Sequence, residues 1–552
     1  MLKSYTWPRY AHRPPPQPAG IEQVPLVVVG AGPVGLCAAI DAAQRGQPVL
    51  LLDDDNTVSV GSRGLCYAKR TLEIFDRLGV GEAVVAKGVT WNVGCTFHGS
   101  HEVFSFNLLP EAGHRRPGMV NLQQYHLEQL LVERAMALPH IDLRWLHKVV
   151  SVTPQDSGAT LQVQTEAGPY TLRCDWLIVA DGARSPLRHM LGLDTVGQVF
   201  QDRFLIADVL LDSEPFAAAS AERRFWFNPS FHSGESALMH RGADAVWRID
   251  FQLGWPTEKH SDPELEKQPE RVGPRIRAAL DAQGLAHIGF ALEWVSVYTF
   301  QCRRMARFRH GRVIFAGDAA HQVSPFGARG ANSGIQDVDN LVWKLDLVMR
   351  GRAGEALLDS YDAERGAAAD ENILNSTRST HFMTPKSRAS HTLRDAVLGL
   401  AAELPAGNFA RALVNSGRLS VPTVLLHSAL NTPDDDAFEG WMVPGAPADD
   451  APLPDGQWLL QMLPAGFTLL LFDEAPSAAQ AAICQALARD AVPVALHTVA
   501  TLQGAVAQRY DARPGTCYLL RPDQHVAARW RRLDLARVRA AVARATAQIS
   551  PE

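Results

Sequence analysis

One stretch near the start of the chain constrains its fold more than any other feature: PLVVVGAGPVGLCAAIDAAQRGQPVLLLDDD, residues 25–55. Its apolar run at 26–29 predicts a buried strand, and glycines follow at positions 30, 32 and 35. A helix of small residues over 36–44 and a second apolar strand over 49–52 complete the pattern. A strand, a glycine-rich turn, a helix and a second strand in this order predict a Rossmann-type α/β unit.

Each glycine of this turn has a physical role. Gly30 makes the tight turn, Gly32 lets a pyrophosphate approach the bare backbone, and Gly35 lets the helix pack on the strand. Asp53 ends the second strand, where it can accept hydrogen bonds from the ribose hydroxyls of an adenosine. The stretch therefore predicts a dinucleotide site. Because NAD and FAD use the same fold, the choice between them stays open at this point.

The composition argues against several other classes of protein. With 552 residues, 46% of them hydrophobic, the chain is long enough for about three or four globular domains. A net charge of -6 without a recurring block of lysine or arginine argues against a nucleic-acid partner. The seven cysteines are dispersed, odd in number and without C-x-x-C spacing, so we expect neither a disulfide framework nor a metal site. No stretch approaches the ~18 apolar residues of a membrane span, so we expect a cytoplasmic protein without a membrane partner.

Two more acidic turns follow apolar strands. The first is Asp181-Gly182, after the apolar run 176–180, and the second is Gly317-Asp318, after the run 312–316. A glycine loop follows the second turn, and from Ile335 apolar residues recur at helical spacing. Backbone N–H groups and a helix N-terminus at such a loop favour a bound anionic or electron-rich ligand. Taken alone, each turn is also explained as an ordinary turn with a capping aspartate.

The three signatures GAGPVG, DGARSPLR and GDAAH, in this order, resemble those of the p-hydroxybenzoate hydroxylase family of single-component FAD monooxygenases. The resemblance extends from residue 25 to residue 366. It implies non-covalent FAD as the cofactor and NADPH or NADH as the co-substrate. It also implies a set of residues that contact FAD: Gly30, Gly32, Gly35, Asp53, Arg63, Gln124, Asp181, Gly317, Asp318, Pro325, Gly330 and Asn332.

Several of these residues have particular roles in the family. By this resemblance Asp53, where the family usually has Glu, holds the adenosine ribose, and Arg63 contacts the cofactor. Gln124 is similar to a glutamine that touches the ribityl chain, and Asp318 to the residue that binds the ribityl hydroxyls. Asp181 is implied to contact FAD and to take part in the use of NAD(P)H.

The loop after Asp318 is implied to lie against the flavin ring. Pro325, Gly327, Gly330 and Asn332 would line the isoalloxazine, and Pro325 would fix the backbone where substrate and flavin meet. The helix that begins near Gly330 would direct its positive end toward the ring, which favours reduction. His321 and Arg329 either tune the ring or serve the structure alone.

A hairpin between the second and third turns predicts a substrate-binding sheet. Two runs, 235–241 and 245–253, are joined by a short turn, and the second run alternates between an apolar face and a face that carries Arg248. Arg248 aligns with a family arginine on the sheet over the flavin and is a predicted catalytic residue. The alternative is a surface arginine paired with Asp250. His240 and Met239 are candidates for facing the substrate, with packing roles as the alternative.

The expected fold is therefore α/β, with a Rossmann-type FAD-binding domain, an inserted β-sheet substrate domain and a C-terminal domain. The C-terminal domain looks thioredoxin-like but lacks C-x-x-C, so we expect it to serve structure or oligomer formation, a homodimer being one open arrangement. The expected boundaries are an N-terminal extension over 1–24, the FAD-binding domain over 25–192 and 301–366, the substrate sheet over 193–300, a helical connector over 367–443 and the C-terminal domain over 444–552.

The resemblance implies an NAD(P)H-dependent enzyme that inserts one atom of O2 into a phenolic ring through a flavin hydroperoxide, with Arg248, Pro325 and His240 as catalytic candidates. The chain resembles 3-(3-hydroxyphenyl)propionate hydroxylase-like enzymes, which implies a meta-hydroxyphenyl acid as the substrate. A tailoring hydroxylase of aromatic polyketides is the alternative. A flavoprotein whose redox state gates protein binding is a further alternative from another class.

Overall fold

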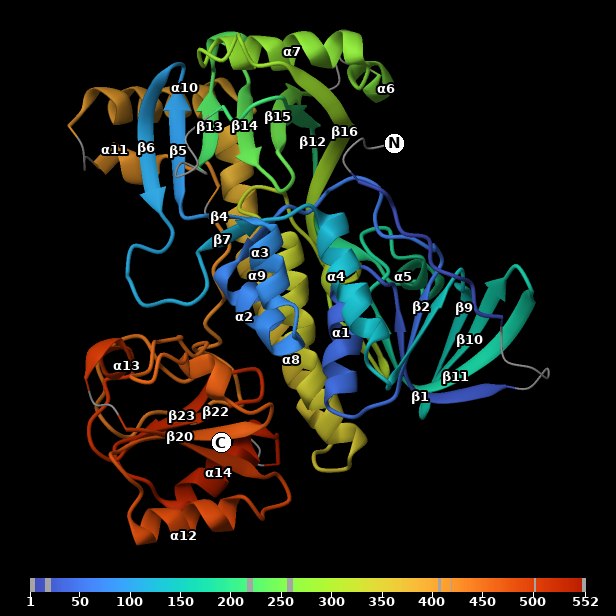
Figure 1. Cartoon of the computed structure of the whole chain (residues 1–552). Helices are drawn as coiled ribbons and strands as arrows, with labels where there is room; N and C mark the ends of the chain where they lie inside the picture. The colour runs from blue at the N-terminus through green and yellow to red at the C-terminus, as the bar shows by residue number, and fades with distance from the viewer. Residues whose placement is uncertain are drawn as a thin grey trace.

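The computed structural model describes residues 5–14, 21–215, 222–255, 262–405, 409–417, 419–500 and 503–548. Within these residues the chain forms a Rossmann domain in the middle, a substrate sheet above it and a C-terminal domain below (Figure 1). Two long helices, α8 (Gly330–Met349) and α9 (Ala356–Met383), lie between the Rossmann domain and the C-terminal domain. The α/β fold class predicted from the sequence is confirmed.

The Rossmann domain is built on an eight-stranded sheet with β1 (Glu22–Val29) at its centre. Its path is β17-β18-β11-β1-β2-β8, and β1 pairs in parallel with both β11 and β2. Helix α1 (Pro33–Gln44) connects β1 to β2 and packs against α8 and α4. The other elements are β2 (Val49–Asp53), β8 (Ile141–Trp145), β9 (Lys148–Gln155), β10 (Gly158–Thr165), β11 (Gly168–Val179), β17 (Arg309–His310), β18 (Val313–Phe315), α2 (Lys69–Leu78), α3 (Gly81–Lys87), α4 (Gln124–Met136) and α5 (Pro186–Met190).

The predicted hairpin forms part of a second eight-stranded sheet, called the substrate sheet below. Its order is β19-β16-β12-β15-β14-β13-β5-β6, so two strands from residues 93–107 extend a sheet that the sequence placed at 193–300. The strands are β5 (Val93–His98), β6 (His101–Asn107), β12 (Thr195–Leu211), β13 (Arg223–Phe227), β14 (Ser236–Arg241), β15 (Val246–Gly254), β16 (Phe290–Met305) and β19 (His321–Gln322). A small sheet of β3 (Cys66–Ala68), β7 (Met119–Asn121) and β4 (Val89–Trp91) lies between the two larger sheets.

The two faces of the substrate sheet have different neighbours. On one face, alternate residues such as Trp247, Ile249 and Phe251 pack against α7 (Pro269–Asp281), which follows the short α6 (Pro263–Glu266). The opposite face carries Arg248, which reaches the Rossmann domain by a hydrogen bond to the carbonyl oxygen of Ser62. The alternation predicted from the sequence therefore separates a core face from a face directed at the predicted FAD site.

The segment after α9 leads to the C-terminal domain through α10 (Arg388–Glu403) and α11 (Phe409–Leu413). The C-terminal sheet has the order β21-β20-β22-β23, with one parallel and two antiparallel pairs. Its elements are β20 (Phe467–Phe472), α12 (Ala478–Leu487), β21 (Val494–Val499), α13 (Gly504–Arg509), β22 (Thr516–Leu520), β23 (Val526–Trp530) and α14 (Leu535–Ala545). This is an α/β domain, and its likeness to thioredoxin stays a prediction.

A buried ion cluster joins the C-terminal domain to the long helices. Arg521 donates hydrogen bonds to both carboxylate oxygens of Glu364 on α9, at 2.6 and 3.1 Å, and Lys344 on α8 donates to the same carboxylate at 2.7 Å. All three side chains are almost completely buried.

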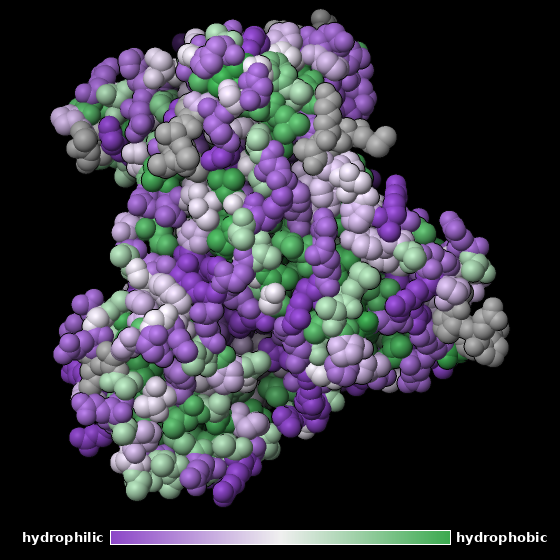
Figure 2. Space-filling view, viewed as in Figure 1, coloured by the Kyte–Doolittle hydropathy of each residue, from purple (hydrophilic) through white to green (hydrophobic). Residues whose placement is uncertain are grey.

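Hydrophobic and hydrophilic residues are interspersed on the face of the molecule shown in Figure 2. Among the described residues, no helix has both the length and the apolar character that crossing a membrane requires.

Candidate active site

The three acidic turns of the sequence lie together at one edge of the Rossmann sheet. β1, β2, β11 and β18 run parallel, and their registers bring the last residues of the four strands level. Their carboxyl ends therefore meet, as at the ligand-binding edge of a doubly wound sheet. Gln322 donates a hydrogen bond of 2.6 Å from Nε2 to the carbonyl oxygen of Ala183, which ties the turn at Asp318 to the turn at Asp181.

The glycine loop after β1 has the geometry that its sequence predicts. Gly30 has a φ of +104°, and a Cβ there would lie 2.4 Å from the carbonyl oxygen of Ala180. A Cβ at Gly35 would lie 1.9 Å from the carbonyl oxygen of Gly30, so helix and loop pack in direct backbone contact. A Cβ at Gly32 would meet no atom within 4 Å. The backbone at Gly32, which caps the N-terminus of α1, is therefore open to a ligand.

Asp53 lies at the end of β2, beside the glycine loop. Its Oδ2 accepts a hydrogen bond of 2.6 Å from the N–H of Ala31, and its Oδ1 accepts one of 2.9 Å from the N–H of Asp55. Burial raises the pKa of Asp53 to about 6, although these two backbone donors oppose the shift. Each carboxylate oxygen keeps a lone pair for a further donor, as the predicted contact with ribose hydroxyls requires.

Asp181 and Asp318 have acceptor capacity that the protein does not use. Oδ2 of Asp181 accepts a hydrogen bond of 3.1 Å from the N–H of Leu187, but its Oδ1 is buried without a partner. The Asp318 carboxylate has no hydrogen-bond partner among the described residues, and its side chain is exposed. The surrounding protein raises the pKa of Asp318, and His321 and Arg63 act in the opposite direction. Both acids can therefore accept donors from a ligand.

Arg63 and Gln124 belong to one structural unit. Arg63 is exposed and lies close enough to Asp318 to act on its charge. Gln124, the first residue of α4, accepts a hydrogen bond of 2.9 Å from the N–H of Gly64 and donates one of 2.8 Å to Glu128. The side chain of Gln124 thus supports the loop that presents Arg63, and the predicted contacts of both residues with FAD stay predictions.

The two predicted flavin contacts in the loop before α8, Pro325 and Asn332, lie in different surroundings. Pro325 is exposed, so its ring is free to contact a ligand. Asn332 is completely buried, and its Oδ1 accepts from the N–H of Ala68 at 2.8 Å while its Nδ2 donates to the carbonyl oxygens of Cys66 and Ala328. The Asn332 side chain is therefore used within the protein, where it fixes the loop to β3.

Two helix N-termini converge at this loop. α1 begins at Pro33 and α8 at Gly330. Val34 packs between them, since a Cβ on Gly317 or on Gly334 would lie 2.9 or 2.7 Å from its side chain. The positive ends of both helix dipoles consequently face the same region, which favours an anionic ligand or charge that builds up on a ligand.

His321 and Arg329 both lie in buried networks. His321 Nε2 is 2.6 Å from Oδ2 of Asp337, whose other oxygen accepts from Nε of Arg365 at 2.7 Å. Burial alone would raise the pKa of Asp337, but His321 and Arg365 outweigh this effect and lower it to about 2. Arg329 donates from Nη1 to Oδ1 of Asn372 at 2.6 Å. These contacts favour the structural alternative for both residues.

Arg248 lies on the face of the substrate sheet that is directed at the Rossmann domain, but its acidic partner is Asp208. Arg248 is only 5% exposed and donates to both carboxylate oxygens of Asp208 on β12, at 2.8 and 2.9 Å. Its Nη2 also donates to the carbonyl oxygen of Ser62, next to Arg63. The alternative of a surface arginine paired with Asp250 is therefore wrong, because adjacent strands bring Asp208 directly opposite Arg248.

Three further polar residues lie beside Arg248 on the same face. Arg223, His240 and Asp250 are all more than nine-tenths buried, and each keeps a polar atom without a partner: Nη1, Nδ1 and Oδ1 respectively. Burial raises the pKa of Asp250 to about 7, against the opposing effect of Arg248 and Arg223. Burial together with the two arginines lowers the pKa of His240 well below its usual value. We call Arg223, His240, Arg248 and Asp250 the polar cluster.

Met239 does not belong to this face. It lies in the core beneath α7, and Gln283 donates to its sulfur at 3.7 Å. The structure favours the packing alternative for Met239, because successive residues of a strand point to opposite faces of the sheet and His240 lies on the other face.

The open backbone at Gly32, the unused oxygens of Asp181 and Asp318 and the two helix N-termini fit a dinucleotide that carries a pyrophosphate, a polyol chain and a flat ring. Fold and site together define the class of Rossmann-type flavoproteins in which a second sheet covers the flavin. The chain belongs to the FAD binding domain family, whose model matches residues 23–376.

Comparison with known proteins narrows the class further. 6-Methylpretetramide 4-monooxygenase from Streptomyces rimosus is 31% identical over an alignment of 549 positions that covers 94% of this chain and 92% of that protein. A 3-(3-hydroxy-phenyl)propionate/3-hydroxycinnamic acid hydroxylase from Mycolicibacterium smegmatis is 28% identical over 384 residues, 69% of this chain and 65% of that protein. The solved structure of the flavin-dependent monooxygenase PieE in complex with FAD and substrate has a TM-score of 0.79 at 24% identity and covers 96% of this chain and 99% of its own. The chain is an FAD-dependent aromatic monooxygenase, and the family predicted from the sequence is confirmed.

Several residues that build the site were not predicted. Asp208 is 40 positions from Arg248, and no local pattern indicates their pairing. Arg223 opens the apolar strand RRFWF, and its unusual position at the start of a buried run is the one signal that could have identified it. Asp337 is likewise an acid among the apolar positions of α8. Buried charges at apolar positions are costly unless they are paired or functional, so such positions are useful candidates.

Proposed function

We propose that this enzyme hydroxylates a phenolic aromatic substrate with NAD(P)H as the reductant and O2 as the oxygen source. One atom of O2 replaces a ring hydrogen to form a hydroxyl group, the other leaves as water, and NAD(P)H supplies the two electrons. The observation that carries the proposal is the polar cluster, which is buried, faces the FAD-binding domain and contains three unpartnered polar atoms. Buried polar groups without partners are uncommon and suit a site that a ligand completes.

The residues of the FAD site have complementary roles. Bound FAD supplies the capacity to take a hydride from NAD(P)H and to activate O2. Gly32 and the N-terminus of α1 would hold the pyrophosphate, and Asp53 would accept from the adenosine ribose. Asp318 would accept from the ribityl hydroxyls, and the positive end of the α8 dipole would favour negative charge on the bound ring. Pro325 holds the backbone where substrate and ring meet.

The polar cluster activates the phenol. Oδ1 of Asp250 accepts the phenolic proton, since a carboxylate with a pKa of about 7 is a suitable base near neutral pH. Arg248 stabilises the phenolate by its positive charge, and Arg223 offers a second positive charge with an unpartnered Nη1, because neither guanidinium is readily deprotonated. His240 stays neutral and contributes a hydrogen bond to a second oxygen of the substrate. An ionised phenol donates electron density to the ring position that receives the oxygen atom.

Two substrate classes fit this chemistry. A meta-hydroxyphenyl acid would place its carboxylate on Arg223, and a relative named for such substrates is similar over 69% of this chain. An aromatic polyketide is the second candidate. It is favoured by the relative named for a polyketide intermediate, whose similarity extends over 92% of its own length and so includes the C-terminal domain.

The test is a panel that contains a simple phenol, 3-(3-hydroxyphenyl)propionate and a polyhydroxylated polycyclic aromatic. We expect one class to accelerate NAD(P)H consumption and to yield a product that carries an atom of isotopically labelled O2, detected by mass. Asp250→Asn should retain FAD and basal NAD(P)H consumption but lose product formation. NAD(P)H consumption that is equal with and without every compound, and no labelled product, would contradict the proposal and favour a redox-gated flavoprotein.

A further inference from the structure

We infer that residues 5–13 form a strap that holds the loop 54–64 against the FAD site, so that retention of FAD depends on the N-terminal segment of the chain. The strap precedes the residues that match the family, and no role follows for it from the three acidic turns. The inference concerns the binding of FAD and does not depend on the identity of the aromatic substrate.

The loop that the strap covers extends along the FAD site. It begins after Asp53, the predicted ribose ligand, and includes Arg63, whose charge acts on Asp318. Between these residues the loop has neither helix nor strand. Such a segment opens easily unless other residues hold its backbone.

One anchor of the loop lies within the Rossmann domain. The buried carboxylate of Glu128 accepts hydrogen bonds from the N–H of Ser59 at 2.5 Å and from its hydroxyl at 2.7 Å. Ser62 accepts from Arg248 of the substrate sheet, and Gly64 donates to Gln124. The middle of the loop, residues 55–58, receives none of these contacts.

The strap supplies further anchors for the middle of the loop, beside one hydrogen bond of 3.1 Å from the N–H of Leu146 to the carbonyl oxygen of Asp55. The indole Nε1 of Trp7 donates to the carbonyl oxygen of Ser59 at 3.2 Å, and the N–H of Tyr10 donates to the carbonyl oxygen of Asn56 at 2.9 Å. Arg9 donates to the Asn56 side chain at 2.7 Å. Ser59 is therefore held from both sides, by Glu128 through its N–H and by Trp7 through its carbonyl.

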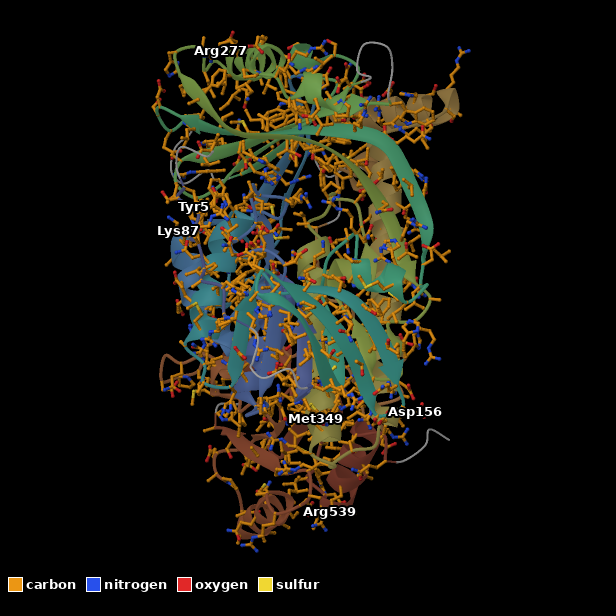
Figure 3. The ribbon with its side chains drawn as sticks, turned by 90° about the vertical axis from the view of Figure 1, so that its right-hand side faces the viewer. Tyr5, Lys87, Asp156, Arg277, Met349 and Arg539 are labelled. Atoms are coloured by element: carbon orange, nitrogen blue, oxygen red, sulfur yellow. The ribbon has the colours of Figure 1, made fainter. Side chains whose placement is uncertain are left out.

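Aromatic contacts fix the strap itself. Tyr5 packs on Tyr125 of α4 with ring centroids 4.3 Å apart, and its hydroxyl donates to Gln129 at 2.9 Å. Tyr10 stacks on Trp145 at 4.7 Å and 11° between the ring planes. Figure 3 shows Tyr5 between the Rossmann domain and the substrate sheet.

The strap also connects the loop to the polar cluster. Tyr5, Trp7 and Tyr10 pack around buried Val58 of the loop in a cluster that includes Trp294 of β16. The Trp294 ring lies 5.9 Å from the Arg248 guanidinium, and a Cβ on Gly61 would lie 2.3 Å from this ring. A change in the strap therefore reaches both the loop 54–64 and, through Trp294, Arg248 of the polar cluster.

The experiment measures release of FAD from the holoenzyme after dilution, followed by the rise in fluorescence of free FAD. We expect Trp7→Ala to accelerate release about tenfold, since a hydrogen bond and an aromatic contact are lost together. Trp7→Phe keeps a ring but loses the donor to Ser59 and should give a smaller acceleration. Trp441→Ala removes a half-exposed tryptophan from the segment that leads to the C-terminal domain and is the matched control.

The control should release FAD at the wild-type rate. Wild-type release rates in both Trp7 variants would overturn the inference. So would equal acceleration by Trp7→Ala and Trp441→Ala, because this result would indicate a general loss of stability. If Trp7→Ala does not yield folded holoenzyme, the comparison of Trp7→Phe with the control decides the question.

Discussion

Arg248→Lys tests the contact by which the substrate sheet holds the loop at Ser62, beside the predicted FAD site. Lysine keeps the positive charge but replaces a planar fork with a single ammonium group. Arg248 makes two hydrogen bonds to Asp208 and one to the carbonyl of Ser62, and an ammonium in the same space can keep about one of the three. Hydrogen bonds that involve a charged group contribute about 1.5–3 kcal/mol each, so the loss of two, partly relieved by relaxation, should lower the free energy of unfolding by about 2–4 kcal/mol. A sequence-based view of Arg248 as remote from the core would predict no loss of stability.

The assay is urea unfolding of the holoenzyme followed by tryptophan fluorescence, together with the rate of flavin reduction by NAD(P)H and the yield of H2O2. Flavin reduction should be slower or more H2O2 should form, because the loop that carries Arg63 loses its anchor at Ser62. The matched control is Arg241→Lys on the neighbouring strand, whose partner Glu214 is half-exposed and whose loss should cost less than about 1 kcal/mol. If Arg248→Lys is as stable as Arg241→Lys and reduces its flavin at the wild-type rate, the contacts of Arg248 with Asp208 and Ser62 do not have the role assigned to them.

Three other predictions follow from the site. Asp318→Ala should weaken FAD binding without loss of the fold, because the carboxylate has no partner among the described residues; equilibrium binding of FAD to the apoprotein measures this, and unchanged affinity would contradict the assignment. Gly35→Ala should prevent folding or abolish FAD binding, since its Cβ would collide with the carbonyl of Gly30, whereas Gly32→Ala should fold and lose FAD affinity only; soluble yield and FAD content distinguish the two variants. Asp250 has a folded-state pKa raised to about 7, so its contribution to stability is present below the unfolded pKa of about 4 and is lost as the pH rises through 7. Asp250→Asn should remove this fall in stability between about pH 4 and pH 7. The free energy of unfolding measured across this pH range checks it, and the same pH dependence in variant and wild type would contradict the prediction.

Sequence alone was sufficient for the features that depend on local periodicity. The local spacing of strand, glycine turn and helix around Gly30 predicts a Rossmann-type unit with a dinucleotide site. The common FAD site of the three acidic turns is what the family resemblance implies. The alternation in β15 likewise predicts that Trp247 packs in the core and that Arg248 faces the other side. In these cases neighbours along the chain determine the direction of each side chain.

Contacts between distant segments required the tertiary structure. Asp208 was not recognised as the partner of Arg248, because strand pairing and register decide which residues lie opposite one another. The addition of β5 and β6 to the substrate sheet depends in the same way on pairing between strands that are far apart in the chain. The N-terminal segment carries no periodic pattern, and only its contacts with Asn56, Ser59 and Tyr125 identify it as a strap. Local sequence sets the direction of a side chain, whereas its partner is set by the folding of remote segments onto one another.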